Sequence, residues 1–167
     1  MKIRSETPQD IDVIHALTAD AFKSMPYSNG AEPFIIDALR ADGDLILSLV
    51  IEKESEIIAH IAFSPVQIGQ ENIEWFGLGP VSVLPSHQRQ GIGSFLIKSG
   101  LKRIKERGAK GCALIGNPQY YERFGFKSVE GFTYQNVDRQ YVMQKPFEGE
   151  YKLGELSYCR GFDAKVI

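Results

Sequence analysis

Apolar residues recur with the 3.6-residue spacing of a helix in several parts of the chain. The spacing predicts a helix from about residue 7 to 22, a second around 34–39 and a longer one over 91–107. Thr7 and Pro8 fit the N-cap and first position of the first helix, and Gly108 fits the end of the longest. Ile92, Phe95, Leu96, Ser99 and Ile104 give the longest helix a stripe at helical spacing, which is apolar apart from Ser99.

Apolar runs bounded by turn residues predict the strands. They cover residues 2–6, 45–53, 57–68, 72–83, 112–115, 126–130 and 139–143, with a brief helix at 119–124. Strands that alternate with helices in this order predict an α/β fold with a mixed β-sheet flanked by helices. No linker or repeat divides the chain, so we expect a single domain over 1–167. The apolar tail, about 147–167, is expected to pack on it.

Charge and composition exclude several classes of protein. A formal net charge of −2 over 167 residues does not favour binding to nucleic acid. The chain has no apolar run long enough to span a membrane and begins without the apolar region of a signal peptide, so we expect a cytoplasmic protein. The three histidines are scattered and the two cysteines lack partners at zinc-ligand spacing, so we expect no metal site.

The most informative motif joins the strand 72–83 to the longest helix. Gln88, Gly91 and Gly93 stand at the spacing Gln-x-x-Gly-x-Gly where the loop becomes a helix. A helix start offers unpaired N–H groups, and glycines let a ligand approach the main chain, so this is an anion site, typically for phosphate. It lacks the Lys-Ser/Thr pair of a Walker loop and the third glycine of a Rossmann fingerprint. A plain strand-to-helix turn and another kind of nucleotide-binding fold remain open.

In its context this motif resembles the acyl-CoA-binding motif of the GNAT superfamily of N-acetyltransferases. The resemblance covers nearly the whole chain, because the order of elements is that of the GNAT fold. It implies acetyl-CoA as co-substrate, with pantetheine along the strand before the loop and pyrophosphate on the loop amides. The cofactor-binding residues it implies are Val81, Ser82, Val83, Gln88, Arg89, Gln90, Gly91, Ile92, Gly93, Ser94 and Asn117.

A second motif, Tyr120-Tyr121-Glu122-Arg123-Phe124-Gly125-Phe126, resembles the Tyr-x-x-x-Gly-Phe element of the same family. The resemblance places Tyr121 at the tyrosine that protonates the departing CoA thiolate. A phenol and a thiol have similar pKa values, so a proton passes between them with little penalty. The alternatives are that Tyr121 only anchors the small helix, or that Tyr120 is the acid.

A base for the amine is harder to assign. By the same resemblance, several GNAT proteins carry a glutamate on the strand before the glycine loop, at the position that is Gly77 in this chain. Glu74 is the best carboxylate on the same strand, although ordered water could serve instead. His60 is a weaker candidate, because a lone histidine in an apolar strand is usually structural. A main-chain N–H near Val81 to Val83 is expected to stabilise the thioester oxygen as negative charge develops on it. Pro80 cannot be this donor, because proline has no main-chain N–H.

These observations predict an acyl-CoA-dependent N-acyltransferase, most simply an acetyltransferase in which the amine attacks the thioester directly. Three runs, beginning at Leu78, Gly116 and Leu156, resemble a bacterial subgroup called YhbS-like. A protein of this fold that binds acyl-CoA as a sensor without turnover is the alternative. The acceptor is a small-molecule or peptide amine that the sequence does not specify, and the apolar tail could pack across a homodimer.

Overall fold

The computed structural model describes residues 1–166, with Asn72 described by its backbone alone. Within them a mixed sheet of eight strands forms. Its main path runs β1 (Lys2–Ser5), β2 (Leu47–Lys53), β3 (Glu56–Ile68), β4 (Glu71–Val83), β5 (Gly111–Ile115) and β7 (Val142–Pro146). β8 (Gly154–Tyr158) pairs with β3 beyond the end of β2, and β6 (Phe132–Thr133) pairs with β8. The α/β mixed sheet expected from the sequence is confirmed.

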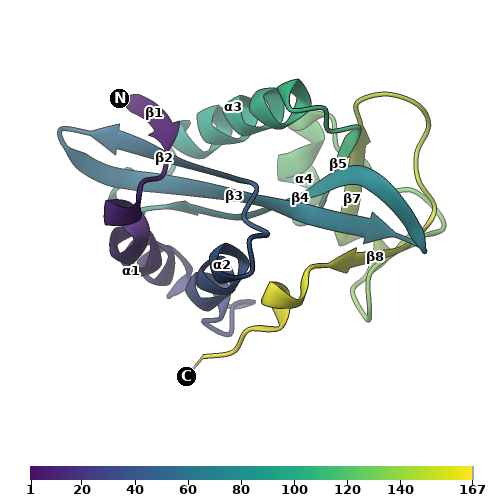
Figure 1. Cartoon of the computed structure of the whole chain (residues 1–167), viewed down its shortest axis with the longest axis horizontal. Helices are drawn as coiled ribbons and strands as arrows, with labels where there is room; N and C mark the ends of the chain where they lie inside the picture. Colours follow the sequence, from purple (N-terminus) through teal and green to yellow (C-terminus); the bar gives the residue numbers. More distant parts are fainter. Residues whose placement is uncertain (167) are drawn as a thin grey trace.

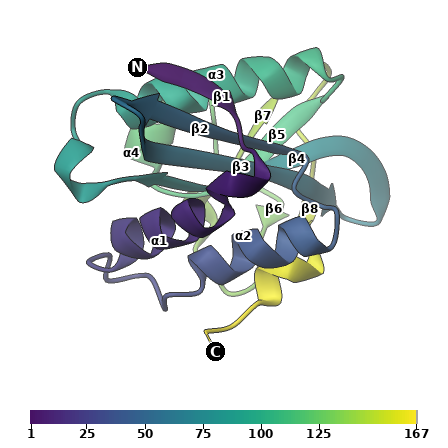
Figure 2. The same ribbon diagram turned by 60° about the vertical axis from the view of Figure 1, so that its left-hand side comes forward.

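Helices cover both faces of the sheet, as Figures 1 and 2 show. α3 (Ile92–Glu106) and the short α4 (Pro118–Tyr121) lie on one face, and α1 (Ile11–Phe22) and α2 (Glu32–Ala41) lie on the other. The alternation of the strands explains this division, because successive side chains point to opposite faces. Ile61 and Phe63 of β3 belong to the core under α3, whereas Val50, opposite His60 in the β2–β3 register, packs with Ile14 and Ile36 under α1 and α2. None of the described helices is long and apolar enough to cross a membrane.

Most predicted elements are present within a residue or two, but the predicted strand 126–130 is wrong. Only Lys127 pairs there, with Gln144 of β7. The physical reason is that Phe126 packs in the core under α3 while Phe132 packs in the cluster on the opposite face. The chain must cross the sheet edge between these two rings, so it cannot continue along β7.

The strand predicted at 139–143 begins later than expected, at Val142. The Asp138 carboxylate accepts a hydrogen bond from the Gln140 N–H at 3.2 Å, which starts a 3₁₀ turn over Arg139–Tyr141. The tail forms β8 and a second 3₁₀ turn, Arg160–Asp163, that packs on α2. This C-terminal segment lies beneath α2 in Figure 2.

Candidate active site

The central feature of the site is the separation of β4 from β5. The two strands pair in parallel only from Trp75 to Gly77, opposite Gly111 to Ala113. β4 stays paired with β3 as far as Val83, with an extra β4 residue between the pairs Phe63–Leu78 and Ile61–Val81. β4 is therefore irregular between Gly77 and Pro80, where two glycines and a proline interrupt regular pairing. Among the described residues, no strand pairs with the other edge of β4 beyond Gly77, so its main-chain groups there are available to a ligand.

The glycine loop closes one end of this open edge. Gly91 is the N-cap of α3 with φ of +80°, a left-handed conformation that glycine adopts without strain. A β-carbon at Gly91 would meet nothing within 4 Å, so the backbone is openly accessible there. At Gly93 a β-carbon would lie 3.4 Å from the Tyr120 hydroxyl oxygen and 3.7 Å from Val83. The end of β4, the start of α3 and the Tyr120 side chain thus converge.

Two of the predicted cofactor-binding residues have structural hydrogen bonds of their own. The Gln88 side-chain amide donates to the Val83 carbonyl oxygen at 3.0 Å, which ties the loop to the end of β4. The Asn117 side chain accepts from the Gln119 N–H at 3.0 Å and caps α4. Ile92 is buried in the core, so only its main chain can face a ligand, whereas Arg89 is exposed.

Tyr121 fills the space that the absent side chain of Gly116 leaves at the end of β5. A β-carbon at Gly116 would lie only 2.4 Å from the Tyr121 ring. The ring packs in an aromatic cluster with Tyr120, Phe124 and Phe126. Burial raises the pKa of Tyr121 well above its usual range, and the neighbouring Tyr120, Tyr27 and Cys112 raise it further. Tyr121 therefore keeps its proton at neutral pH and can only donate it.

Tyr158, which sequence reasoning missed as a site residue, occupies the space beside Gly77. A β-carbon at Gly77 would lie 2.7 Å from the Tyr158 ring and 2.8 Å from Val66. Tyr158 stacks on Phe162 with ring centroids 4.2 Å apart, and burial raises its pKa well above the usual range. The apolar character of the tail was the available signal, but only the β3–β8 pairing brings Tyr158 to β4.

The structure does not bring Glu74 and Tyr121 together. Glu74 is exposed and forms an ion pair with Lys110 at 3.3 Å, at the start of β5. Tyr121 packs on Gly116 at the other end of β5, which is six residues or roughly 20 Å further along the strand. A carboxylate in this position does not share a site with the Tyr121 phenol.

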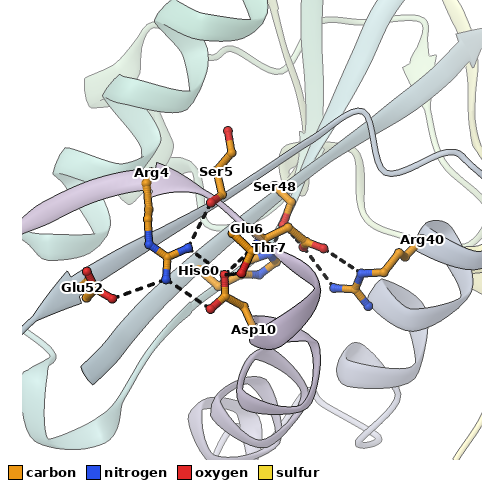
Figure 3. Close-up of polar contacts among 9 residues, drawn as sticks. All are labelled: Arg4, Ser5, Glu6, Thr7, Asp10, Arg40, Ser48, Glu52 and His60. Carbon is orange, nitrogen blue, oxygen red and sulfur yellow. Dashed lines mark hydrogen bonds and ion pairs between the residues drawn. The ribbon is translucent and has the colours of Figure 1, made fainter. Parts of the chain in front are cut away.

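His60 is completely buried under α1 and belongs to a polar chain that reaches the surface. Its Nε2 atom lies 2.7 Å from the Ser48 hydroxyl, and that hydroxyl donates to the Glu6 carboxylate. Arg40 binds the same carboxylate through two nitrogens, at 2.8 and 3.0 Å. Figure 3 shows this chain beside a separate ion-pair group formed by Arg4, Asp10 and Glu52.

The sequence profile of the acetyltransferase (GNAT) domain matches residues 2–129. The chain belongs to the GNAT acetyltransferase family. It is 37% identical over 128 residues to the uncharacterized N-acetyltransferase YhbS of Escherichia coli K12, covering 76% of this chain and 74% of YhbS. This relationship confirms the family and the subgroup that the two motifs indicated.

Solved structures of GNAT proteins resemble the fold over almost its whole length. A GNAT acetyltransferase from Brucella melitensis, in complex with acetyl-CoA, has a TM-score of 0.87 and 44% identity over 97% of each chain. YhbS from Escherichia coli, in complex with CoA, has a TM-score of 0.88 and 28% identity over 97% of this chain and 91% of YhbS.

Proposed function

We propose that this protein transfers an acetyl group from acetyl-CoA to an amine. The observation that carries the proposal is the open edge of β4 after Gly77, closed at one end by Gly91 and the start of α3. An extended ligand with an anionic end fits such an edge, since the strand offers main-chain groups and the helix start offers N–H donors. The acetyl-CoA and CoA in the related Brucella and YhbS structures support this choice of ligand.

Main-chain groups supply most of the proposed binding. Val81, Ser82 and Val83 hold the pantetheine, and the loop from Arg89 to Ser94 holds the pyrophosphate. Ser82 contributes its backbone only, because its side chain is buried on the α1 face. Gln88 and Asn117 act indirectly, through the loop anchor and the α4 cap described above.

The proposed chemistry is direct attack of a neutral amine on the thioester. Bound side by side, the two reactants need no protein nucleophile. The N–H of Val81, the first after Pro80, is suited to stabilise the thioester oxygen as it gains negative charge. Tyr121 then protonates the departing sulfur. Since Glu74 lies on β4 beside the start of β5, far from Tyr121, we assign the amine's proton to a route through water rather than to Glu74.

The acceptor is a small-molecule or peptide amine, reached from the α1–α2 side of β4. We further propose a cytoplasmic enzyme, which two free cysteines support because a reducing compartment keeps thiols unpaired. A homodimer through the tail is supported by Leu153, an apolar residue with two thirds of its surface exposed.

The test is thiol release from acetyl-CoA with a panel of amines, followed with a thiol-reactive dye. We expect acceptor-dependent release by the wild-type protein and almost none by Tyr121→Phe. Calorimetry with acetyl-CoA provides the second measurement. Tight binding without release for any amine class would identify a sensor instead of an enzyme.

A further inference from the structure

The hydrogen bonds around His60 determine where its proton lies. The Ser48 hydroxyl has one proton, and it must donate that proton to Glu6, because a carboxylate only accepts. Burial raises the pKa of Glu6, but hydrogen bonds from Arg40 and Ser48 outweigh burial and hold this pKa below its usual value. Ser48 must then accept from His60, so Nε2 carries the ring proton. Nδ1 is left as a bare acceptor, and it has no partner among the described residues.

Other buried groups without partners lie on the same face of the sheet. They are the hydroxyls of Thr18, Ser64 and Ser82, each at most 1% exposed. Ser82 of β4 stands directly opposite His60 of β3, which puts their β-carbons roughly 5 Å apart. Thr18 lies in α1, which packs over both strands. Buried polar groups nearly always have hydrogen-bond partners, so this set indicates internal water linking them to Nδ1.

The set extends to the proposed reaction centre. Ser64 is the direct register partner of Gly77, the residue where β4 and β5 separate. Between Ser64 and His60 the same face of β3 carries only Ala62, a buried residue with a small side chain that lies beside the irregular Gly79–Pro80 segment. Hydroxyls and water both accept and donate, so together they can pass a proton along this face.

We propose that, in the acetyl transfer proposed above, His60 receives the amine's proton through the buried hydroxyls of Ser64, Thr18 and Ser82 and the water between them. One amine N–H bond breaks, each hydroxyl or water passes on one proton, and one N–H bond forms at Nδ1. The imidazolium charge is offset by Glu6 through Ser48. After the product leaves, the proton returns to solvent along the same groups. His60 acts at a distance, in place of the carboxylate that Gly77 and Tyr158 exclude.

The low pKa of His60 suits its proposed role as a weak proton acceptor. Burial lowers the pKa of His60 to about 4, with Glu6 raising it and Arg40 lowering it by smaller amounts. Glu6 and Arg40 are the only charged groups among the causes of this shift, and Ser82, directly opposite His60 on β4, carries no charge. The nitrogen becomes a much stronger acid once it has attacked the thioester, so a weak base accepts its proton readily. His60 also stays neutral at physiological pH, so its ring can accept a proton.

The first test is independent of activity. Long-range ¹H–¹⁵N NMR of protein labelled in its three histidines reports the tautomer of each ring, and His60→Gln identifies the His60 signal. We expect a neutral ring protonated at Nε2 at neutral pH. A ring protonated at Nδ1, or a charged ring, overturns the proposal whether or not the protein transfers acetyl groups.

The second test is kinetic. Ser48→Ala and His60→Gln are expected to lower kcat by on the order of 10²-fold or more and to change its solvent deuterium isotope effect, with the KM for acetyl-CoA unchanged. Ser48→Thr keeps the hydroxyl and should restore kcat. The matched control is Arg4→Gln, which loosens the ion-pair group beside this chain without touching it (Figure 3).

If Ser48→Ala does not fold, Glu6→Gln provides the same comparison, since the amide oxygen still accepts from Ser48 but carries no charge. Values of kcat for these variants within about twofold of Arg4→Gln would overturn the relay while leaving acetyl transfer intact. Absence of release by wild-type protein would instead count against the proposed function, and the NMR measurement would still decide the state of His60.

Discussion

The Tyr158 ring lies against Gly77, so closely that a β-carbon on Gly77 would come within 2.7 Å of it. The resemblance to the GNAT family places at Gly77 the glutamate that several members carry on this strand. A glutamate there would have to displace a partly buried ring that is held by β8 and stacked on Phe162. The departure from the family pattern at Gly77 and the aromatic tail are therefore two parts of one packing arrangement.

Gly77→Ala should destabilise the protein by about 1–3 kcal/mol, because the added methyl group meets the Tyr158 ring and Val66 in a packed interior. Urea unfolding measures the change. Ser157→Ala, at an exposed position of the same β8 strand, is the control and should shift stability by less than about 0.5 kcal/mol. Equal unfolding midpoints for the two variants would mean that the contact is looser than the structure indicates.

Gly93→Val should lose acetyl-CoA binding in a folded protein. A β-carbon alone fits at Gly93, 3.4 Å from the Tyr120 hydroxyl, but a branched side chain would project between Tyr120 and Val83. Gly91→Ala should instead reduce stability by about 1–2 kcal/mol through its left-handed backbone, since the space around it is open. Calorimetry and thermal unfolding separate the two effects. If folded Gly93→Val bound acetyl-CoA with normal affinity, the assignment of this loop to the binding site would be wrong.

Tyr121→Phe should reduce turnover by about 10²-fold or more with near-normal acetyl-CoA affinity, because it removes the donated proton and keeps the ring. Tyr120→Phe is the matched control. Since burial holds the pKa of Tyr121 above its usual range, wild-type activity should show no loss from Tyr121 deprotonation below about pH 10. Wild-type turnover in Tyr121→Phe would leave Tyr121 as an anchor of α4.

Glu74→Gln should leave turnover and its pH dependence unchanged. Glu74 is exposed, and its ion pair with Lys110 contributes less than about 1 kcal/mol. The rate should still rise with pH as the free-amine fraction grows. A pH–rate profile of both proteins with one active acceptor provides the measurement. A large loss of activity in the folded variant would restore Glu74 as the base.

Asp10→Asn should destabilise the protein by about 1–2 kcal/mol at neutral pH. The hydrogen bond from Arg4 lowers the pKa of Asp10 from 3.8 to about 2, against the opposing effect of burial. A lowered carboxyl pKa stabilises the fold above the unfolded value, so the contribution is complete above about pH 4 and is lost as the pH falls towards 2. Wild-type and variant stabilities measured by urea unfolding should converge across that range.

The local sequence determined the cofactor side of the proposed site. The positions of α3 and α4 and the open backbone at Gly91 depend on neighbours within one turn or one loop, so periodicity and motif spacing were enough to predict them. The predicted stripe of α3 was right for Ile92, Leu96 and Ile104, but Phe95 is exposed. Ile97 and Leu101 are buried instead. The irregularity of β4 at Gly77 to Pro80 also has a local cause, because proline and glycine limit strand pairing wherever they occur.

Tertiary structure decided the acceptor side of the proposed site. Tyr158 reaches Gly77 from 81 residues further along the chain through the β3–β8 pairing, and Glu6, Ser48 and His60 meet because three separate segments pack together. Neither arrangement leaves a periodic pattern in the sequence, since each depends on contacts between distant segments. The path of the chain across the sheet edge between Phe126 and Phe132 likewise depends on contacts with distant segments. Local propensity indicates a strand there, but the burial of the two rings on opposite faces overrides it.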